Sequence, residues 1–267
     1  MGALCASAQA YVAELAGQRV ALEREAARVA RGAPFEAALR PGATVAVIAE
    51  IKRSSPSKGA INAGIDAGAQ AAAYAAGGAA ALSVLTEPTR FGGRPADVTE
   101  AIAATHGSVP IIKKDFHVDP LQLVEARALG ASAALLIARA LSPADLRTMQ
   151  RAARDLGLET LVEVRDEREL DAALAADAQV IGVNNRNLET LVIDLATGER
   201  LVPQIPADRV AVFESGVSTA AEVARAARAG ADAVLVGSSV SAAADPGAAV
   251  AALTAVPRVG RGALART

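Results

Sequence analysis

Six polar side chains interrupt apolar segments of this sequence at points where buried strands would end. They are Glu50, Lys52, Lys114, Glu163, Asn184 and Glu214. Taken singly, each is consistent with a solvated residue at a strand end. An isolated buried charge is very unfavourable, so the whole set predicts mutual pairing or a ligand. Lysines among carboxylates stay protonated and can act as acids, whereas carboxylates among lysines stay ionised and can act as bases. We therefore interpret the set as an acid–base catalytic site.

The elements that must position this set are short runs of Val, Ile, Leu and Ala. Nearly continuous apolar runs are typical of strands buried on both faces, as in a parallel sheet. Helical stretches separate the runs, with start signals at Asp119, Ser142, Asp166 and Thr219. Eight strand–helix units favour an α/β fold, the (β/α)8 TIM barrel, in which the ends of the strands meet at one mouth. The runs are Val45–Ile51, Ala80–Leu85, Pro110–Lys114, Ala133–Ile137, Thr160–Val164, Val180–Asn184, Val210–Glu214 and Ala233–Val236.

The predicted barrel covers residues 45–255 of a single domain spanning residues 1–267. Residues 1–40 form an N-terminal helical extension, with a helix expected within Ala6–Arg31. The stretch from Ala67 to Thr86 carries no charge and is long enough to cross a membrane. It contains Gly77 and Gly78, which indicate a helix, a turn and a strand instead. We therefore expect no contact with a membrane.

The composition argues against several classes of protein. The net charge is -2 and the pI is about 5.8, whereas a nucleic-acid surface would need a basic excess. Cys5 is the only cysteine, which excludes an internal disulfide and fits a reducing cytoplasm, and no Lys or Arg precedes Arg19 as a secretory signal would require. The histidines His106 and His117 lack partners at metal-ligand spacing. We expect a cytoplasmic protein with no metal and no cofactor.

Glycine and serine follow the last two predicted strands. Ser215-Gly216 comes after one and Gly237-Ser238 after the other, and glycine lets the backbone approach a ligand closely. Phosphate sites recur at these two positions in this fold. Ordinary turns use the same residues, so the pattern is informative only in the context of a barrel. Ser55 belongs to a polar loop after the first strand that suits an anion, although an ordinary surface loop would read the same way.

Several long motifs resemble indole-3-glycerol phosphate synthase, in order, from about Val45 to Ser241. The resemblance implies an enzyme of tryptophan biosynthesis that closes an indole ring. Its substrate would be 1-(2-carboxyphenylamino)-1-deoxyribulose 5-phosphate, from which CO2 and water are released without a cofactor. Other tryptophan-pathway enzymes would be its candidate partners. The motifs are Glu50–Ser57, Ser83–Gly93, Ile111–Phe116, Ile181–Leu188, Glu214–Gly216 and Val236–Ser239.

The resemblance also implies a role for each residue of the site. Lys114 would be the general acid for ring closure, Lys52 would bind anionic groups and supply a later proton, and Glu163 would be the base for dehydration. The supporting roles are orientation of the lysines by Glu50 and Glu214, substrate holding by Asn184, ligand contacts (mainly to phosphate) by Ser55, Gly216, Gly237 and Ser238, carboxylate binding by Arg186 and Ser215, and packing on the aromatic ring by Phe91 and Phe116.

Two positions depart from the family pattern. The family's N-terminal helix helps to cover the mouth, often through an aromatic contact, and here only Tyr11 offers one. His117 stands in the loop after the third strand, near the expected mouth, where an apolar residue is more usual.

Two other classes of protein remain open at this stage. A sugar-phosphate isomerase or epimerase would share the phosphate-binding barrel, but such enzymes commonly use paired Asp, Cys with Asp, or His with a metal. Cys5 lies far from any predicted strand end. A catalytically inactive barrel kept as a binding partner would have little reason to retain Lys52, Lys114 and Glu163 together.

Overall fold

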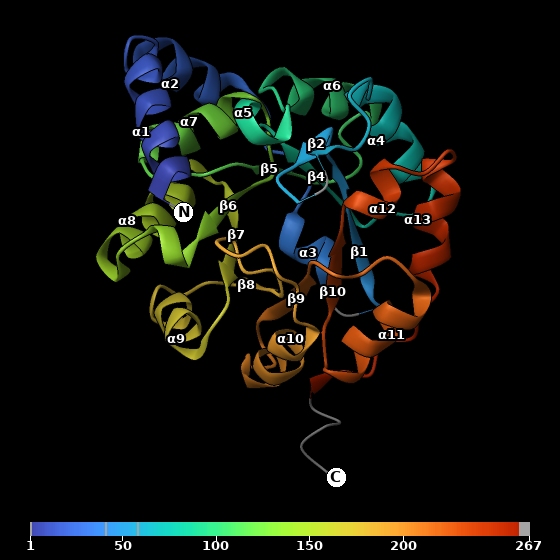
Figure 1. Ribbon diagram of the computed structural model, residues 1–267. Helices are drawn as coiled ribbons and strands as arrows, with labels where there is room; N and C mark the ends of the chain where they lie inside the picture. The colour runs from blue at the N-terminus through green and yellow to red at the C-terminus, as the bar shows by residue number, and fades with distance from the viewer. Residues whose placement is uncertain (1, 41, 58, 262–267) are drawn as a thin grey trace.

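The computed structural model describes residues 2–40, 42–57 and 59–261, which form a closed barrel of parallel strands surrounded by helices (Figure 1). Around the barrel the strands follow the order β1-β10-β9-β8-β7-β6-β5-β4, and β4 pairs again with β1. The predicted eight-stranded barrel is confirmed, and each predicted strand end lies within one residue of the observed one. The strands are β1 (Ala46–Ile51), β4 (Ala81–Leu85), β5 (Ile111–Lys114), β6 (Ala133–Ile137), β7 (Glu159–Val164), β8 (Val180–Asn184), β9 (Val210–Glu214) and β10 (Ala233–Val236).

Helices connect the strands, and their starts carry the expected caps. Asp119 and Thr219 each form a capping box, and the side chains of Ser142 and Asp166 accept hydrogen bonds from N–H groups of the first turn. A short antiparallel pair, β2 (Ser54–Ser55) with β3 (Gly59–Ala60), lies in the loop after β1. The connecting elements are α4 (Ala67–Ala76), α5 (Pro88–Phe91), α6 (Ala96–Ala104), α7 (Pro120–Ala128), η1 (Ala138–Ala140), α8 (Pro143–Leu156), α9 (Glu167–Ala175), α10 (Leu195–Leu201), η2 (Val202–Gln204), α11 (Ala220–Arg228), α12 (Ser238–Ser241) and α13 (Pro246–Thr254).

The uncharged stretch from Ala67 to Thr86 consists of α4, a turn and β4, as expected. Within the described ranges, no helix is both long and apolar enough to cross a membrane.

Alternation along the strands determines what faces the inside of the barrel. Successive strand residues point to opposite faces, so one apolar inward residue predicts the next inward position two residues later. Ile48 on β1 lies in the inner apolar cluster, and Glu50 follows it in the same inward row. Ile112 on β5 is likewise followed by Lys114. The inward side chains are therefore apolar at the starts of these strands and ionisable at their ends.

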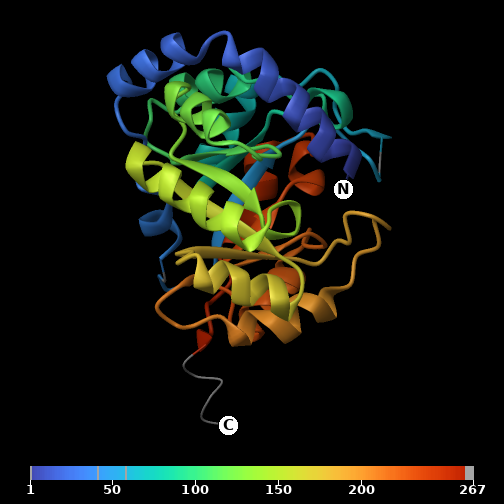
Figure 2. The same cartoon turned by 90° about the vertical axis from the view of Figure 1, so that its left-hand side faces the viewer.

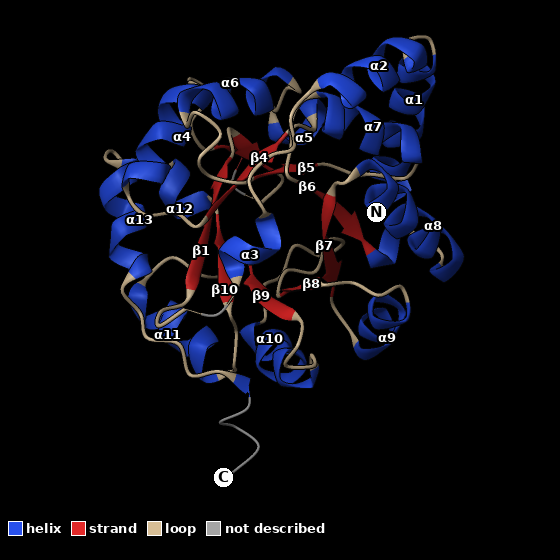
Figure 3. Cartoon of the chain, turned by 180° about the vertical axis from the view of Figure 1, so that it is seen from behind, coloured by secondary structure: helices blue, strands red, loops and turns tan. Residues whose placement is uncertain are grey.

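A short helix before the first strand closes the opposite end of the barrel. Figure 3 shows α3 (Phe35–Leu39) lying over that end. Phe35 and Leu39 are fully buried in the inner cluster with Ile48 and Ile112. Because this end is filled with apolar side chains, a small molecule can approach the inward charges only from the other end.

The N-terminal extension contains two further helices where we predicted one. α1 (Gly2–Ala16) and α2 (Arg19–Arg28) lie along the outside of the barrel beside α7 (Figure 2). Arg127 of α7 donates hydrogen bonds to the carbonyls of Val29 and Ala30, at 2.6 and 3.3 Å, and so holds the end of α2. The break falls at Gly17 and Gln18, and glycine weakens a helix interior.

A buried ionic cluster joins α1 to β5 on the outer side of the barrel. Lys113 is completely buried, and its Nζ lies 3.1 Å from Asp115 Oδ2 and 3.2 Å from Glu125 Oε2. The hydroxyl of Tyr11 donates a hydrogen bond to the other oxygen of Glu125. Burial alone would lower the pKa of Lys113, but Asp115 and Glu125 raise it, so this lysine is charged. Tyr11 therefore anchors α1 to α7 and is absent from the lining of the mouth, where the family pattern had placed an aromatic contact.

We expect the substitution Lys113→Met to lower the free energy of unfolding by about 3–5 kcal/mol, because two carboxylates would lose their buried counter-charge. Chemical denaturation measures this value. The surface substitution Arg19→Ala, which removes a half-exposed ion pair with Glu23, should change it by less than about 0.5 kcal/mol. Equal effects of the two substitutions would contradict the importance of the buried cluster.

Candidate active site

A cavity of about 440 Å³ opens at the C-terminal ends of the strands. Its volume suits a small-molecule ligand. All fourteen residues that the sequence predicted for the site line this cavity, including those assigned by resemblance. Arg90, Asp115 and Ser239 also line it and were not predicted.

Glu50 is the shared partner of both predicted lysines. Its Oε1 lies 2.8 Å from Lys52 Nζ, and its Oε2 lies 3.3 Å from Lys114 Nζ. Ser83 of β4 donates a further hydrogen bond of 3.4 Å to Oε2. Burial alone would raise the pKa of Glu50, but Lys114 and Lys52 lower it to about 2. Glu50 is therefore ionised throughout the neutral range, and it draws the two ammonium groups to one side of the cavity.

Glycine on a neighbouring strand end makes room for this ion pair. A Cβ atom at Gly237 would lie 2.5 Å from Glu50 Oε1 and 2.9 Å from Lys52 Nζ. A side chain at this position would force the ion pair to shift, so glycine lets the loop after β10 approach the pair as it stands.

Glu214 and Glu163 form the opposite side of the site. Burial and then the charge of Glu163 raise the pKa of Glu214 to about 8, although Lys114 opposes the shift from 4.0 Å away. Both carboxyl oxygens of Glu214 are buried without a hydrogen-bond partner among the described residues. A Cβ at Gly182 would lie 1.8 Å from Glu214 Oε1, so β8 leaves this side chain its space. At neutral pH Glu214 holds a proton beside Glu163.

Lys114 lies between these two sides. Burial would lower its pKa, but Glu50, Glu214 and Glu163 raise it above the ordinary value for lysine. Because Lys114 stays protonated at neutral pH, it can donate a proton to an oxygen that develops negative charge.

The two remaining ends of the cavity differ in character. Ser215, Gly216 and Gly237-Ser238 line one end, where Ser239 Oγ is buried without a hydrogen-bond partner in the described chain. Phe91 and Phe116 line the cavity at the ends of β4 and β5, together with aliphatic side chains. Phe116 is buried. Such a cavity offers polar backbone and hydroxyl groups to an anion and flat apolar surface to an aromatic ring.

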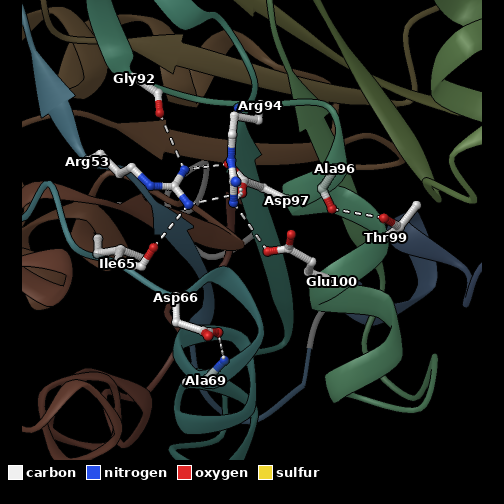
Figure 4. Close-up of polar contacts among 10 residues, drawn as sticks. All are labelled: Arg53, Ile65, Asp66, Ala69, Gly92, Arg94, Ala96, Asp97, Thr99 and Glu100. Carbon is white, nitrogen blue, oxygen red and sulfur yellow. Dashed lines mark hydrogen bonds and ion pairs between the residues drawn. The ribbon is translucent and has the colours of Figure 1, made fainter.

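The loop after β1, which carries Lys52, is fastened to the loop after β4. Arg53 forms a bidentate ion pair with the buried Asp97, and it donates to the carbonyls of Ile65 and Gly92 at 3.0 and 3.4 Å (Figure 4). Arg94 pairs with the same carboxylate at 2.7 Å. Burial would raise the pKa of Asp97, but the two arginines lower it, so the carboxylate is ionised. The ion pairs hold the residue next to Lys52 in a fixed position.

His117 is not at the mouth, contrary to its expected position. It is buried, does not line the cavity, and its Nδ1 donates to the Leu135 carbonyl at 2.7 Å. Burial and then the charge of Lys113 lower the pKa of His117 to about 4. This residue is a neutral part of the packing behind β5.

Sequence reasoning also missed two polar residues next to predicted ones. Lys113 precedes Lys114 and Asn185 follows Asn184, and both are completely buried on the outer side of their strands. Both could have been found from the sequence, because each is a polar residue at an outward position, and outward positions covered by helices are normally apolar.

The fold and the site define a (β/α)8-barrel enzyme with a lysine–carboxylate acid–base centre. The family model described as indole-3-glycerol phosphate synthase matches residues 1–253. A protein from Opitutus terrae named indole-3-glycerol phosphate synthase is 48% identical over 219 residues, which cover 81% of this chain and 82% of that one. Another from Streptomyces coelicolor, named indole-3-glycerol phosphate synthase 2, is 46% identical over 260 residues, covering 95% and 99%. The chain belongs to the indole-3-glycerol phosphate synthase family.

A solved structure supports the barrel fold alone. The chain of 3-hexulose-6-phosphate synthase from Salmonella typhimurium matches with a TM-score of 0.63 at 15% identity, covering 78% of this chain and 96% of that chain.

The raised pKa of Glu214 gives an expectation for catalysis. As the pH rises through about 8, Glu214 ionises beside Glu163, and the added negative charge should disfavour an anionic substrate. We expect kcat/KM to fall as the pH rises above about 8. The substitution Glu214→Gln should remove this fall, because the amide cannot ionise. The measurement is kcat/KM against pH from about 6 to 10.

The free energy of unfolding should also depend on pH through the ionisation of Glu214. The folded-state pKa, about 8, lies above the ordinary value of 4.5, so the unfolded state loses its proton first and stability falls as the pH rises between these values. Glu214→Gln should abolish this loss, and Glu199→Gln, which removes a surface partner of Arg225, should leave it in place. A pH dependence unchanged by Glu214→Gln would contradict the assignment.

Proposed function

We propose that this chain converts 1-(2-carboxyphenylamino)-1-deoxyribulose 5-phosphate to indole-3-glycerol phosphate, with release of CO2 and water, in tryptophan biosynthesis. The observation that carries the proposal is the arrangement of charge in the cavity. The ammonium groups of Lys52 and Lys114 share the Glu50 carboxylate on one side. The carboxyl groups of Glu163 and Glu214 lie on the other. This reaction needs both an acid and a base within one small cavity.

The substrate has three parts that the cavity can accommodate. Its phosphate would lie at the end formed by Ser55, Gly216, Gly237 and Ser238, its aromatic ring against Phe91 and Phe116, and its carboxylate near Arg186 and Ser215. Asn184 would hold the sugar chain between them. Arg186 is half-buried and donates to the Leu191 carbonyl at 3.1 Å, which keeps the guanidinium in the loop after β8.

Ring closure is the first chemical step. The aromatic carbon that carries the carboxylate attacks the carbonyl carbon C2, and the electrons of the carbonyl bond move to its oxygen. Lys114 donates a proton to this oxygen, because it is held protonated among carboxylates and flanks the cavity. The electrostatic field of the ammonium groups stabilises the developing negative charge.

Decarboxylation and dehydration complete the reaction. When CO2 leaves, the electron pair of the broken C–C bond returns to the ring and restores its aromaticity. The C2 hydroxyl then leaves as water after accepting a proton, for which Lys52 is the second donor. Glu163 removes a proton from C1, and the electrons left behind form the double bond of the indole. Glu50 and Glu214 orient the lysines and tune their charge during these steps.

The alternative classes are less well supported by the site. Cys5 lies on α1 and does not line the cavity, so it cannot serve an epimerase as an acid or base there. An inactive barrel would not need a fully buried Glu50 between two lysines. With a single cysteine in the chain, we also propose a cytoplasmic location. The enzymes that supply the substrate and consume the product are the candidate partners.

We expect Lys114→Met to reduce kcat by at least about 100-fold while the protein stays folded, because Met keeps the apolar stem and deletes the acid. Purified protein is incubated with the substrate, and indole absorbance is followed. Circular dichroism and thermal unfolding check the fold, and Arg154→Met, at an exposed ion pair with Asp177, is the control. Near-wild-type turnover in Lys114→Met would overturn the proposed role, and no indole formation by the wild type would overturn the proposed function.

A further inference from the structure

Asn185 is a polar residue without a role in the proposed reaction, yet it is completely buried behind the site. It directly follows Asn184, the last residue of β8. Because strand residues alternate, Asn184 faces the cavity and Asn185 faces α10 on the outer side. None of the steps above uses its side chain.

Every hydrogen-bonding group of Asn185 is occupied. Its backbone N–H donates to the Glu214 carbonyl at 3.0 Å, and its own carbonyl accepts from Asp194 N–H at 2.9 Å. Its Nδ2 donates to the carbonyls of Glu214 and Ser215, at 2.8 and 3.1 Å, and its Oδ1 accepts from Gly198 N–H at 2.8 Å. One side chain therefore fastens β8 and α10 to the turn that follows β9.

The turn it holds has an unusual backbone. Ser215 has a φ of 65° and Gly216 a φ of 79°. The left-handed region is open to glycine but unfavourable for serine, so the surroundings must impose it. The hydrogen bonds from Asn185 Nδ2 to the carbonyls of residues 214 and 215 provide that constraint.

The same two hydrogen bonds determine where the N–H groups point. In a trans peptide the carbonyl and the following N–H are antiparallel, and the described chain contains no cis peptide. Because the carbonyls of Glu214 and Ser215 are directed at Asn185, the N–H groups of Ser215 and Gly216 are directed away from it. Both residues line the cavity on that side. Successive N–H groups of this kind form a concave site for an anion.

Two neighbouring glycines leave the room that this arrangement needs. A Cβ at Gly198 would lie 2.8 Å from Asn185 Oδ1 and 2.2 Å from the Phe213 ring, so α10 can reach Asn185 only through glycine. A Cβ at Gly216 would lie 2.6 Å from Leu195 and 2.8 Å from Ile193. The turn is thus also packed tightly against Ile193 and Leu195, between β8 and α10.

We propose that Asn185 is a positioning residue, which holds the Ser215–Gly216 backbone in its left-handed form so that the N–H of Gly216 receives the phosphate of the substrate. The inference rests on the proposed function for the identity of that phosphate. Inorganic phosphate is the probe that tests the position of the anion without any turnover.

The first test is Asn185→Asp, which keeps the acceptor for Gly198 and replaces the two donated hydrogen bonds by repulsion between oxygens. We expect phosphate, measured by calorimetry, to bind at least tenfold more weakly. KM should rise at least tenfold, and kcat should change less than threefold. Asn187→Asp is the matched control, because Asn187 Oδ1 only accepts, from the N–H groups of Glu189 and Thr190. It should bind phosphate like the wild type.

The second test is rescue by Ser215→Gly, because glycine adopts the left-handed form without help. The loss of phosphate affinity caused by Asn185→Asp should be at least threefold smaller in the Ser215→Gly background than in the wild-type background. A residue that only stabilises the fold would give the same loss in both backgrounds. If Asn185→Asp does not fold, Asn185→Ser, which adds no charge, replaces it in both comparisons.

The outcomes separate this inference from the proposed function. Wild-type turnover with unchanged phosphate affinity and KM in the Asn185 variants would overturn the positioning role alone. An Asn185-dependent phosphate site in a protein that forms no indole would support the positioning role and overturn the proposed reaction. Absence of phosphate binding to the wild type would overturn the placement of the anion at Gly216.

Discussion

The ion pairs of Glu50 are the interaction on which the rest of the site depends. One buried carboxylate contacts both Lys52 and Lys114, and without it two ammonium groups would face each other inside an apolar barrel. Removing a buried counter-charge is far more damaging than losing a surface ion pair. Glu50 thus helps to keep Lys114 charged in a cavity whose lining also includes Phe91 and Phe116.

The barrel supplies the geometry that these charges need. In the inward rows, Ile48, Ile112 and Val212 directly precede Glu50, Lys114 and Glu214, so the packing of the barrel and the site belong to the same rows. Gly182 and Gly237 leave the space that the carboxylates occupy. On the outer side, Lys113 ties β5 to α7, and Asn185 ties β8 and α10 to the turn after β9. The ends of β5 and β9 are therefore held from both faces.

The strands and the polar residues at their inward ends could be predicted from the sequence because alternation and apolar runs are local signals, whereas Arg186, Phe91 and Phe116 were assigned through the family resemblance. The outer network could not be predicted, because it joins Lys113 to Glu125 on α7 and Glu125 in turn to Tyr11 on α1, three segments that are separate in the sequence. His117 was misplaced because a residue just after a strand can turn to either face of the barrel. The left-handed backbone of Ser215 has no local signal, since serine does not favour it and only Asn185 and the packing around Gly216 impose it.

Glu50 keeps the acid Lys114 charged inside the cavity. The chain has only four lysines, Lys52, Lys58, Lys113 and Lys114, so ¹⁵N-labelled lysine gives a simple NMR spectrum in which Lys114→Met assigns one signal. Titration of that signal in the wild type and in Glu50→Gln measures the pKa of Lys114 directly. We expect a pKa above the ordinary lysine value in the wild type and a clear fall in the variant. An ordinary pKa in the wild type, or one that Glu50→Gln leaves unchanged, would contradict this account.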